Sequence, residues 1–227
     1  MRNWPRPSSG CCKRVIRFDR AHQMLAVGVA VLAGFVDAIG FVESAGFFVS
    51  FMTGNSTRLA VGLAEGPLAA VVAAIIVTVF VAGVVLGSLA GAWAGRRRTP
   101  IVLFGVTILL ATATMLRLDH EFWSAVLALA LAMGVANAAI AGRDGSVVGV
   151  TYMTGTLVQM GQKIANALRR EGDRRWVYHL GLWGALVGGA VLGAHAVLWS
   201  PPLAYAIAVL LAGLLALRAG WIVRQAG

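Results

Sequence analysis

Two sets of polar residues, about a hundred positions apart, could bind a small solute or an ion. The first set lies in Gly34-Phe-Val-Asp37 and Phe51-Met-Thr-Gly-Asn55, and the second in Gly134-Val-Ala-Asn137 and Tyr152-Met-Thr-Gly-Thr156. Their carboxylate, amide and hydroxyl groups supply hydrogen-bond donors and acceptors. Lipid tolerates polar side chains and irregular backbone only where they face protein or a water-lined cavity. A polar element that occurs twice in an apolar chain therefore indicates a binding site.

Asp37 is the acidic member of this pattern. It lies near the middle of an apolar stretch, where an ionised carboxylate costs about 3 kcal/mol. Its counterpart Asn137 has the same shape and never carries a charge. Asp37 would then be the titratable coupling group of a transporter. The alternative is that Asp37 and Asn137 only bond backbone groups at breaks in neighbouring helices. The full set of candidate binding residues is Asp37, Thr53, Gly54, Asn55, Arg58, Asn137, Thr154, Gly155, Thr156 and Gln159.

Each Thr-Gly step predicts a break in a helix. Glycine permits a positive φ and a close backbone approach. Thr53, Asn55, Thr154 and Thr156 could cap the helix that resumes after the break. The start of a resumed helix attracts anions or carbonyl oxygens, whereas the carbonyls before the break could bind a cation. The pattern predicts a site but not the charge of its ligand.

Arg58 and Lys163 are the cations that lie well inside the two Met-Thr-Gly segments, among nineteen lysines and arginines in the chain. Each follows its Thr-Gly step. They could be counter-ions for Asp37 or for an anionic substrate. The alternative is that their side chains extend to the nearer membrane surface.

The composition predicts a polytopic α-helical membrane protein. The chain has 227 residues, of which 59% are hydrophobic and 12% charged, and its mean hydropathy is +0.82. A soluble domain carries about twice that share of charge. A β-barrel is excluded because no stretch alternates with period two.

The apolar segments repeat. A basic tail, 1–23, precedes a first membrane repeat, 24–117, and a second membrane repeat, 122–224. Besides the Met-Thr-Gly motif, both repeats contain a Gly-x-x-x-Gly pair, Gly83/Gly87 and Gly189/Gly193, followed six residues later by a tryptophan. This glycine spacing is typical of close helix packing. The expected segments are 24–42, 46–64, 68–94 and 101–116 in the first repeat, and 122–141, 147–168, 176–199 and 203–223 in the second.

The placement of the cations favours six spans over eight. The net charge is +10. If both Met-Thr-Gly segments enter and return on one side, nearly all cations face the cytoplasm, as the positive-inside rule requires. The two repeats then have opposite orientations, as in many transporters. The alternative is eight spans and a parallel repeat, which leaves one cationic loop outside: Arg96, Arg97 and Arg98.

Other functions find no support in the sequence. Cys11 and Cys12 are adjacent and lack the spacing of a metal site or a disulfide framework. No motif of a hydrolase, nucleotide-binding protein or dehydrogenase is present, so we expect no enzyme activity and no cofactor or metal. We expect no nucleic-acid partner, because topology accounts for the basic clusters. The expected partners are the lipid bilayer and an unknown solute or ion, with a homodimer as an alternative to a monomer.

The Gly34-Phe-Val-Asp37, Phe51-Met-Thr-Gly-Asn55 and Met153-Thr-Gly-Thr156 stretches resemble the YoaK-like family of uncharacterised bacterial multi-pass membrane proteins. The resemblance covers about residues 24–223. It implies a bacterial inner-membrane protein, with the N-terminus cytoplasmic on the charge pattern, and it assigns no functional residue. Our leading hypothesis is a small secondary transporter whose site lies where the two broken segments cross. The alternatives are a channel and a membrane scaffold that transports nothing.

Overall fold

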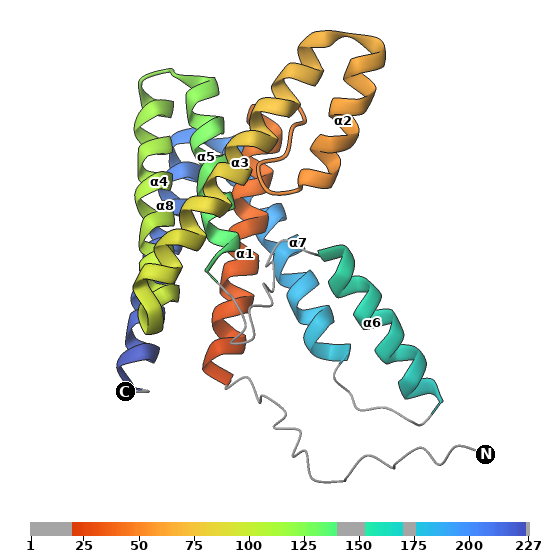
Figure 1. Cartoon of the computed structure of the whole chain (residues 1–227), viewed down its shortest axis with the longest axis vertical. Helices are drawn as coiled ribbons and strands as arrows, with labels where there is room; N and C mark the ends of the chain where they lie inside the picture. Colours follow the sequence, from red (N-terminus) through yellow and green to blue (C-terminus); the bar gives the residue numbers. More distant parts are fainter. Residues whose placement is uncertain (1–19, 140–152, 170–175, 226–227) are drawn as a thin grey trace, which may run out of the picture.

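The structure, a computed structural model, describes residues 20–139, 153–169 and 176–225, and in these ranges it is helical with short connections. Figure 1 shows the helices in chain order. The predicted all-α class is confirmed for the described residues. The elements are α1 (Arg20–Glu43), α2 (Met52–Glu65), α3 (Pro67–Ala94), the 3-10 turn η1 (Gly95–Arg97), α4 (Arg98–Leu118), α5 (Phe122–Asn137), α6 (Met153–Leu168), α7 (Trp176–Trp199) and α8 (Pro201–Gln225).

Several of these helices are apolar and long enough to cross a bilayer. Four continuous helical stretches meet that test: 23–43, 67–118, 176–199 and 201–225. The second stretch contains both α3 and α4, which fold back on each other at η1. The helix α5 is apolar but shorter, with 16 residues. Large apolar side chains such as Leu68, Leu198 and Leu217 are more than 70% exposed, as expected where a helix faces lipid.

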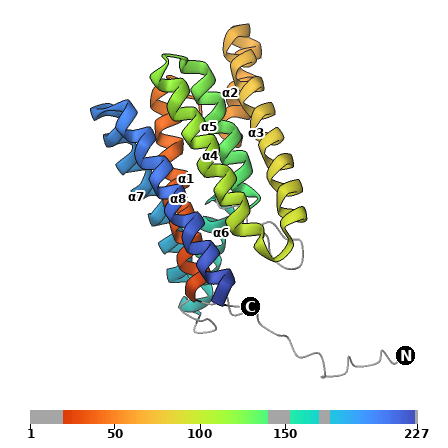
Figure 2. The ribbon, with the colours of Figure 1, turned by 90° about the vertical axis from the view of Figure 1, so that its left-hand side faces the viewer.

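The helices run in alternating directions, apart from two short ones. In Figures 1 and 2, α1 rises to the end of the bundle where the α4–α5 and α7–α8 connections lie. The chain then turns back into the protein, and α2 leads from there to the same end. The helix α6 leads to the opposite end, where α7 begins and where η1 lies. The two short helices therefore run to opposite ends of the bundle.

Glycines bring α1 against α7 and α5 against α3. A Cβ added to Gly34 would overlap the carbonyl oxygen of Leu186, and one added to Gly189 would overlap that of Val31. In the second pair, a Cβ on Gly134 would overlap the carbonyl oxygen of Phe80, and one on Gly83 that of Leu131. The predicted packing role of the Gly-x-x-x-Gly pairs is therefore confirmed. The helix α1 therefore packs closely on α7, and α5 packs closely on α3.

The remaining helix contacts involve α4, α8 and the two short helices α2 and α6. The helix α4 packs on α5 and α8, and α8 packs on α4 and α1. Among the described helices, the short helix α2 packs on α3 alone, and α6 packs on α7 alone. The core is formed largely by α1 and α5, whose buried faces include Val29, Val36, Leu129 and Met133. The two helices that carry Asp37 and Asn137 contact each other in this core.

Candidate functional site

Asp37 holds the non-helical segment that connects α1 to α2. One oxygen, Oδ1, accepts hydrogen bonds from the backbone N–H groups of Val49 at 2.9 Å and Ser50 at 2.8 Å. These N–H groups belong to residues 44–51, which form no helix and would otherwise leave backbone donors unpaired inside the protein. The structural alternative that the sequence left open is therefore realised at Asp37. A role for the charge of Asp37 stays a prediction.

Asn55 makes two bonds to a single residue of the same segment. Its Oδ1 accepts from the backbone N–H of Phe48 at 3.0 Å, and its Nδ2 donates to the carbonyl oxygen of Phe48 at 2.6 Å. The Asn55 side chain is fully buried. A side-chain amide thus pairs with the backbone as a neighbouring strand would. Together, Asp37 and Asn55 fix residues 48–50 from two helices.

The expected caps at the Thr-Gly step are wrong in the first half. The helix α2 begins at Met52, so Thr53, Gly54 and Asn55 belong to its first turn, and no side chain caps it. The break precedes the motif. Gly54 has a negative φ, so its backbone conformation does not require glycine. Glycine is needed there because an added Cβ would approach the rings of Phe48 and Phe51 to 2.9 and 2.7 Å. The Thr53 side chain is exposed.

Ser44 is a functional candidate in this segment that the sequence interpretation missed. Its hydroxyl donates to the carbonyl oxygen of Gly40 at 2.6 Å and accepts from the N–H of Phe47 at 3.0 Å. Two positive φ angles follow, 54° at Ala45 and 108° at Gly46. The Ser-Ala-Gly sequence that directly follows an apolar stretch was the available signal, since serine and glycine favour turns.

Arg58 does not pair with Asp37. Its guanidinium lies 4.9 Å from the centre of the Phe47 ring and packs against Gly46, where an added Cβ would lie 2.5 Å from Nη2. This cation–π contact places the charge beside the turn at 45–46. The expectation of a direct Arg58–Asp37 ion pair is therefore wrong, whereas a role for Arg58 toward a bound anion stays a prediction.

The second-half candidates lie around the start of α6. Asn137 is buried at the end of α5, and its Nδ2 donates to the carbonyl oxygen of Met133 at 2.9 Å. Thr154 and Gln159 are exposed, whereas Gly155 and Thr156 are half-buried. The segment before α6, residues 140–152, lies outside the described residues, as do the tail and its two cysteines.

The two Met-Thr-Gly helices do not meet. No contact joins α2 to α6, and Figure 1 shows them toward opposite ends of the protein. The expected crossing is therefore wrong for the helices themselves. Among the described elements, the two that carry Asp37 and Asn137, α1 and α5, do contact each other.

Lys163 contacts α7 instead of extending to solvent alone. Its Nζ lies 2.8 Å from Nε2 of His179, a buried residue. Because an ammonium group can only donate, Nε2 accepts this bond and the ring proton of a neutral imidazole lies on Nδ1. Lys163 thereby links α6 to α7 through side chains.

A polar cluster closes the end of the bundle near the first non-helical segment. Nε of Arg117 lies 2.6 Å from Oε2 of Glu43, and the hydroxyl of Tyr205 donates to the same oxygen at 3.5 Å. The Glu43 side chain is 8% exposed, so its carboxylate is largely shielded from solvent. The cluster joins α1, α4 and α8. The six-span topology could have indicated the contact between Glu43 and Arg117, because it places the ends of segments 24–42 and 101–116 on the same side of the membrane.

The chain was compared with known proteins. A family model described as "Protein of unknown function (DUF1275)" matches residues 25–219. A protein of Rhizobium meliloti (strain 1021) named UPF0700 transmembrane protein RA0705 is 39% identical over 201 residues, which are 85% of this chain and 87% of that protein. No solved structure matches the chain significantly. The expectation of an uncharacterised membrane-protein family is thereby confirmed.

Proposed function

Because this chain belongs to the DUF1275 family of proteins of unknown function, its role must be inferred from its own residues, and we propose that it is a secondary transporter for a small solute or ion. Its place would be the bacterial inner membrane, with the N-terminus in the cytoplasm. The proposal involves no catalytic step, cofactor or metal.

The observation that carries this proposal is the pair of short helices α2 and α6. They have 14 and 16 residues, so they are about 21 and 24 Å long, less than the roughly 30 Å of a bilayer core, and unlike the equally short α5 they are not apolar along their length. Each runs from inside the protein toward one end, and the two ends are opposite. Broken helices at mid-depth, one from each half, are the usual site of substrate binding in inverted-repeat transporters.

The helix contacts support an inverted repeat with six spans. Exchange of the two halves converts the α1–α7 contact into α5–α3, the α2–α3 contact into α6–α7, and the α1–α8 contact into α5–α4. Trp93 and Trp199, at the ends of α3 and α7, are both more than 80% exposed, as expected for membrane-interface anchors. In this proposal the spans are α1, α3, α4, α5, α7 and α8.

Topology can be tested by cysteine labelling of the full chain in cells. In a background with Cys11 and Cys12 replaced by serine, we expect a membrane-impermeant maleimide to label a cysteine at Ser200 from outside. We expect the same reagent to reach a cysteine at Gly95 only after the cells are opened. Labelling of both positions from outside would favour the eight-span alternative.

Asp37 is the group through which transport would be coupled to protons. Both hydrogen bonds from Val49 and Ser50 end on an oxygen that asparagine also possesses, so Asp37→Asn can keep the loop in place while removing the charge. Asp37→Ala removes the acceptor as well. The two variants therefore separate charge from structure.

The experiment uses proteoliposomes that contain a pH-sensitive dye and are challenged with a panel of amino acids, sugars, carboxylates and inorganic ions. We expect at least one solute to drive proton entry in the wild type. Asp37→Asn should abolish solute-driven proton entry, keep thermal stability and retain solute exchange. Solute-driven proton entry that is unchanged in Asp37→Asn would remove Asp37 from coupling.

The scaffold alternative is favoured by one observation. Among the described residues, every buried side-chain nitrogen or oxygen has a hydrogen-bond partner. A scaffold predicts that the whole panel produces no flux or exchange in the folded wild type, and that Asp37→Asn changes nothing while Asp37→Ala lowers stability. Solute exchange by the wild type would exclude that alternative.

A further inference from the structure

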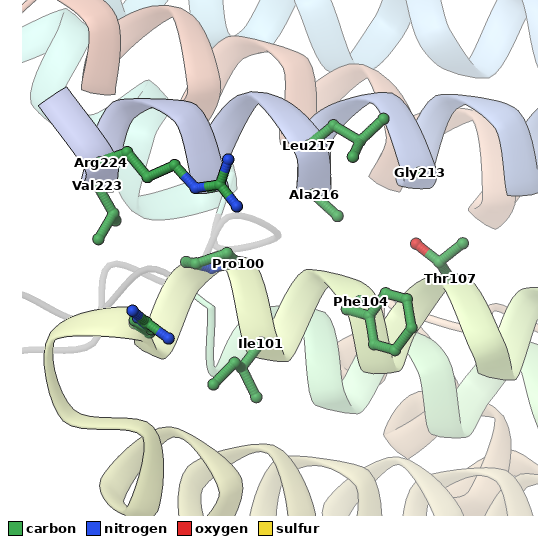
Figure 3. Close-up of a pocket in the computed structure, with 11 residues that line it drawn as sticks. Pro100, Ile101, Phe104, Thr107, Gly213, Ala216, Leu217, Val223 and Arg224 are labelled. Carbon is green, nitrogen blue, oxygen red and sulfur yellow. The ribbon is translucent and has the colours of Figure 1, made fainter.

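An open groove lies between α4 and α8, away from the two Met-Thr-Gly segments. Figure 3 shows its lining, and its volume is about 480 Å³. Pockets for small ligands have volumes of roughly 300–1,000 Å³. The walls are apolar along most of their length: Pro100, Ile101 and Phe104 come from α4, and Gly213, Leu217 and Val223 come from α8.

The groove has the length of one leaflet. It extends along η1 and α4 from Arg97 to Thr107 and along α8 from Arg224 to Gly213. At 1.5 Å per residue these stretches are about 15 Å long, half of the roughly 30 Å core of a bilayer. The groove therefore reaches from one membrane surface to about the middle of the bilayer, the depth that a lipid acyl chain occupies.

Two arginines lie at its outer end. Arg97 in η1 and Arg224 at the end of α8 are both exposed and both line the groove. Within the described part of the chain, neither guanidinium has a carboxylate or carbonyl partner. The neighbouring Arg98 is different, since its Nε donates to the carbonyl oxygen of Ala138 at 3.0 Å. An apolar groove that ends at two unpaired cations is suited to a ligand with an apolar chain and an anionic headgroup.

We propose that the α4–α8 groove binds an anionic phospholipid, with one acyl chain between the helices and the phosphate between Arg97 and Arg224. Guanidinium groups bind phosphate oxygens in a planar, two-pronged arrangement. Basic pockets at the ends of membrane helices are suited to anionic headgroups. A second copy of the chain fits less well, because a partner helix would follow α4 and α8 beyond the single leaflet that the groove spans.

The test measures lipid binding to the purified full chain by native mass spectrometry, with phosphatidylglycerol and phosphatidylcholine of identical acyl chains. We expect phosphatidylglycerol to bind more tightly. Arg97→Gln with Arg224→Gln should weaken phosphatidylglycerol binding roughly thirty-fold and leave phosphatidylcholine unchanged. The matched control is Arg218→Gln, six residues earlier on α8, whose Nη2 contacts Met24 and which does not line the groove. It should change neither affinity.

A second variant tests the acyl-chain position. Gly220 has no atom closer than 4.0 Å to an added Cβ, so Gly220→Leu can fill the groove without a backbone collision. It should weaken both lipids, with thermal unfolding measured to confirm folding. Equal losses in Arg218→Gln and in the groove double variant would overturn the proposal. So would tight binding of inorganic phosphate alone, or a dimer that Gly220→Leu dissociates while lipid binding persists.

Discussion

The two Met-Thr-Gly helices have the same motif in their first turn but are attached to the protein in different ways. The helix α2 contributes the buried residues Asn55 and Gly62, whereas α6 has no buried residue. Each packs on one long helix of its own half. The two helices therefore have similar positions relative to a long neighbouring helix but are held by different contacts.

One aligned position shows how the attachment of α2 differs from that of α6. Gly62 of α2 corresponds to Lys163 of α6 by distance from the Thr-Gly step. An added Cβ on Gly62 would lie 2.6 Å from the backbone nitrogen of Ala70, so the backbones of α2 and α3 are in close contact. Lys163 instead reaches His179 on α7 through a side-chain hydrogen bond. The first half uses backbone packing where the second uses a polar link.

The largest loss of stability is expected at the close glycine contact between α1 and α7, which resembles the contact between α5 and α3. Gly189→Ala places a methyl group on the carbonyl oxygen of Val31 and should lower the unfolding free energy by about 3 kcal/mol. Thermal and denaturant unfolding in detergent measure this. The control is Gly188→Ala, whose added Cβ meets no atom within 4 Å. Equal stability of the two variants would show that the α1–α7 contact is looser than described.

Asn55→Thr gives the first half the residue that the second half has at this position. A threonine cannot reach both the N–H and the carbonyl of Phe48, so buried backbone groups lose their partners and stability should fall by about 2 kcal/mol. Unfolding in detergent and proteolysis between α1 and α2 both report the change. Thr156→Asn is the reciprocal variant. If Asn55→Thr is neutral, residues 48–50 are held in place without the Asn55 amide.

Gly62→Ala tests the close contact between α2 and α3. The added methyl group must move the turn between these helices, which should cost about 1 kcal/mol after the gain in helix propensity. Gly161→Ala on α6 is the matched control, because nothing lies within 4 Å of its added Cβ. We expect the control to be neutral or slightly more stable by the same unfolding measurement. A loss in both variants would point to a shared requirement for glycine.

Lys163→Met should have the smallest effect, below about 1 kcal/mol. It removes one hydrogen bond to His179 while keeping the apolar stem of the side chain. His179→Phe in a double-mutant cycle isolates the link from the effect of each residue alone. A coupling energy near zero would show that α6 is held on α7 by packing rather than by this bond.

The sequence predicted the extent of α7 correctly but placed the break near the first Met-Thr-Gly motif several residues too late. The expected segment 176–199 is the extent of α7, because its ends are marked by charge and by proline. The Thr-Gly step was expected to interrupt a helix, yet the interruption lies at residues 44–51, stabilised by Asp37 and Asn55. Local propensity does not reveal a bond between residues 12 positions apart. The Arg117–Glu43 pair, 74 positions apart, depends even more on the tertiary fold.

The glycine contacts between the halves also determine when the protein can finish assembly. During synthesis, α1 enters the membrane long before α7, yet the surface around Gly34 fits the backbone of α7. Until α7 is inserted, that surface faces lipid, and the core made by α1 and α5 stays incomplete. An isolated first half would then lack its main packing partner and be a target for membrane proteases. Two separately synthesised halves, by contrast, have complementary surfaces and could assemble into one protein.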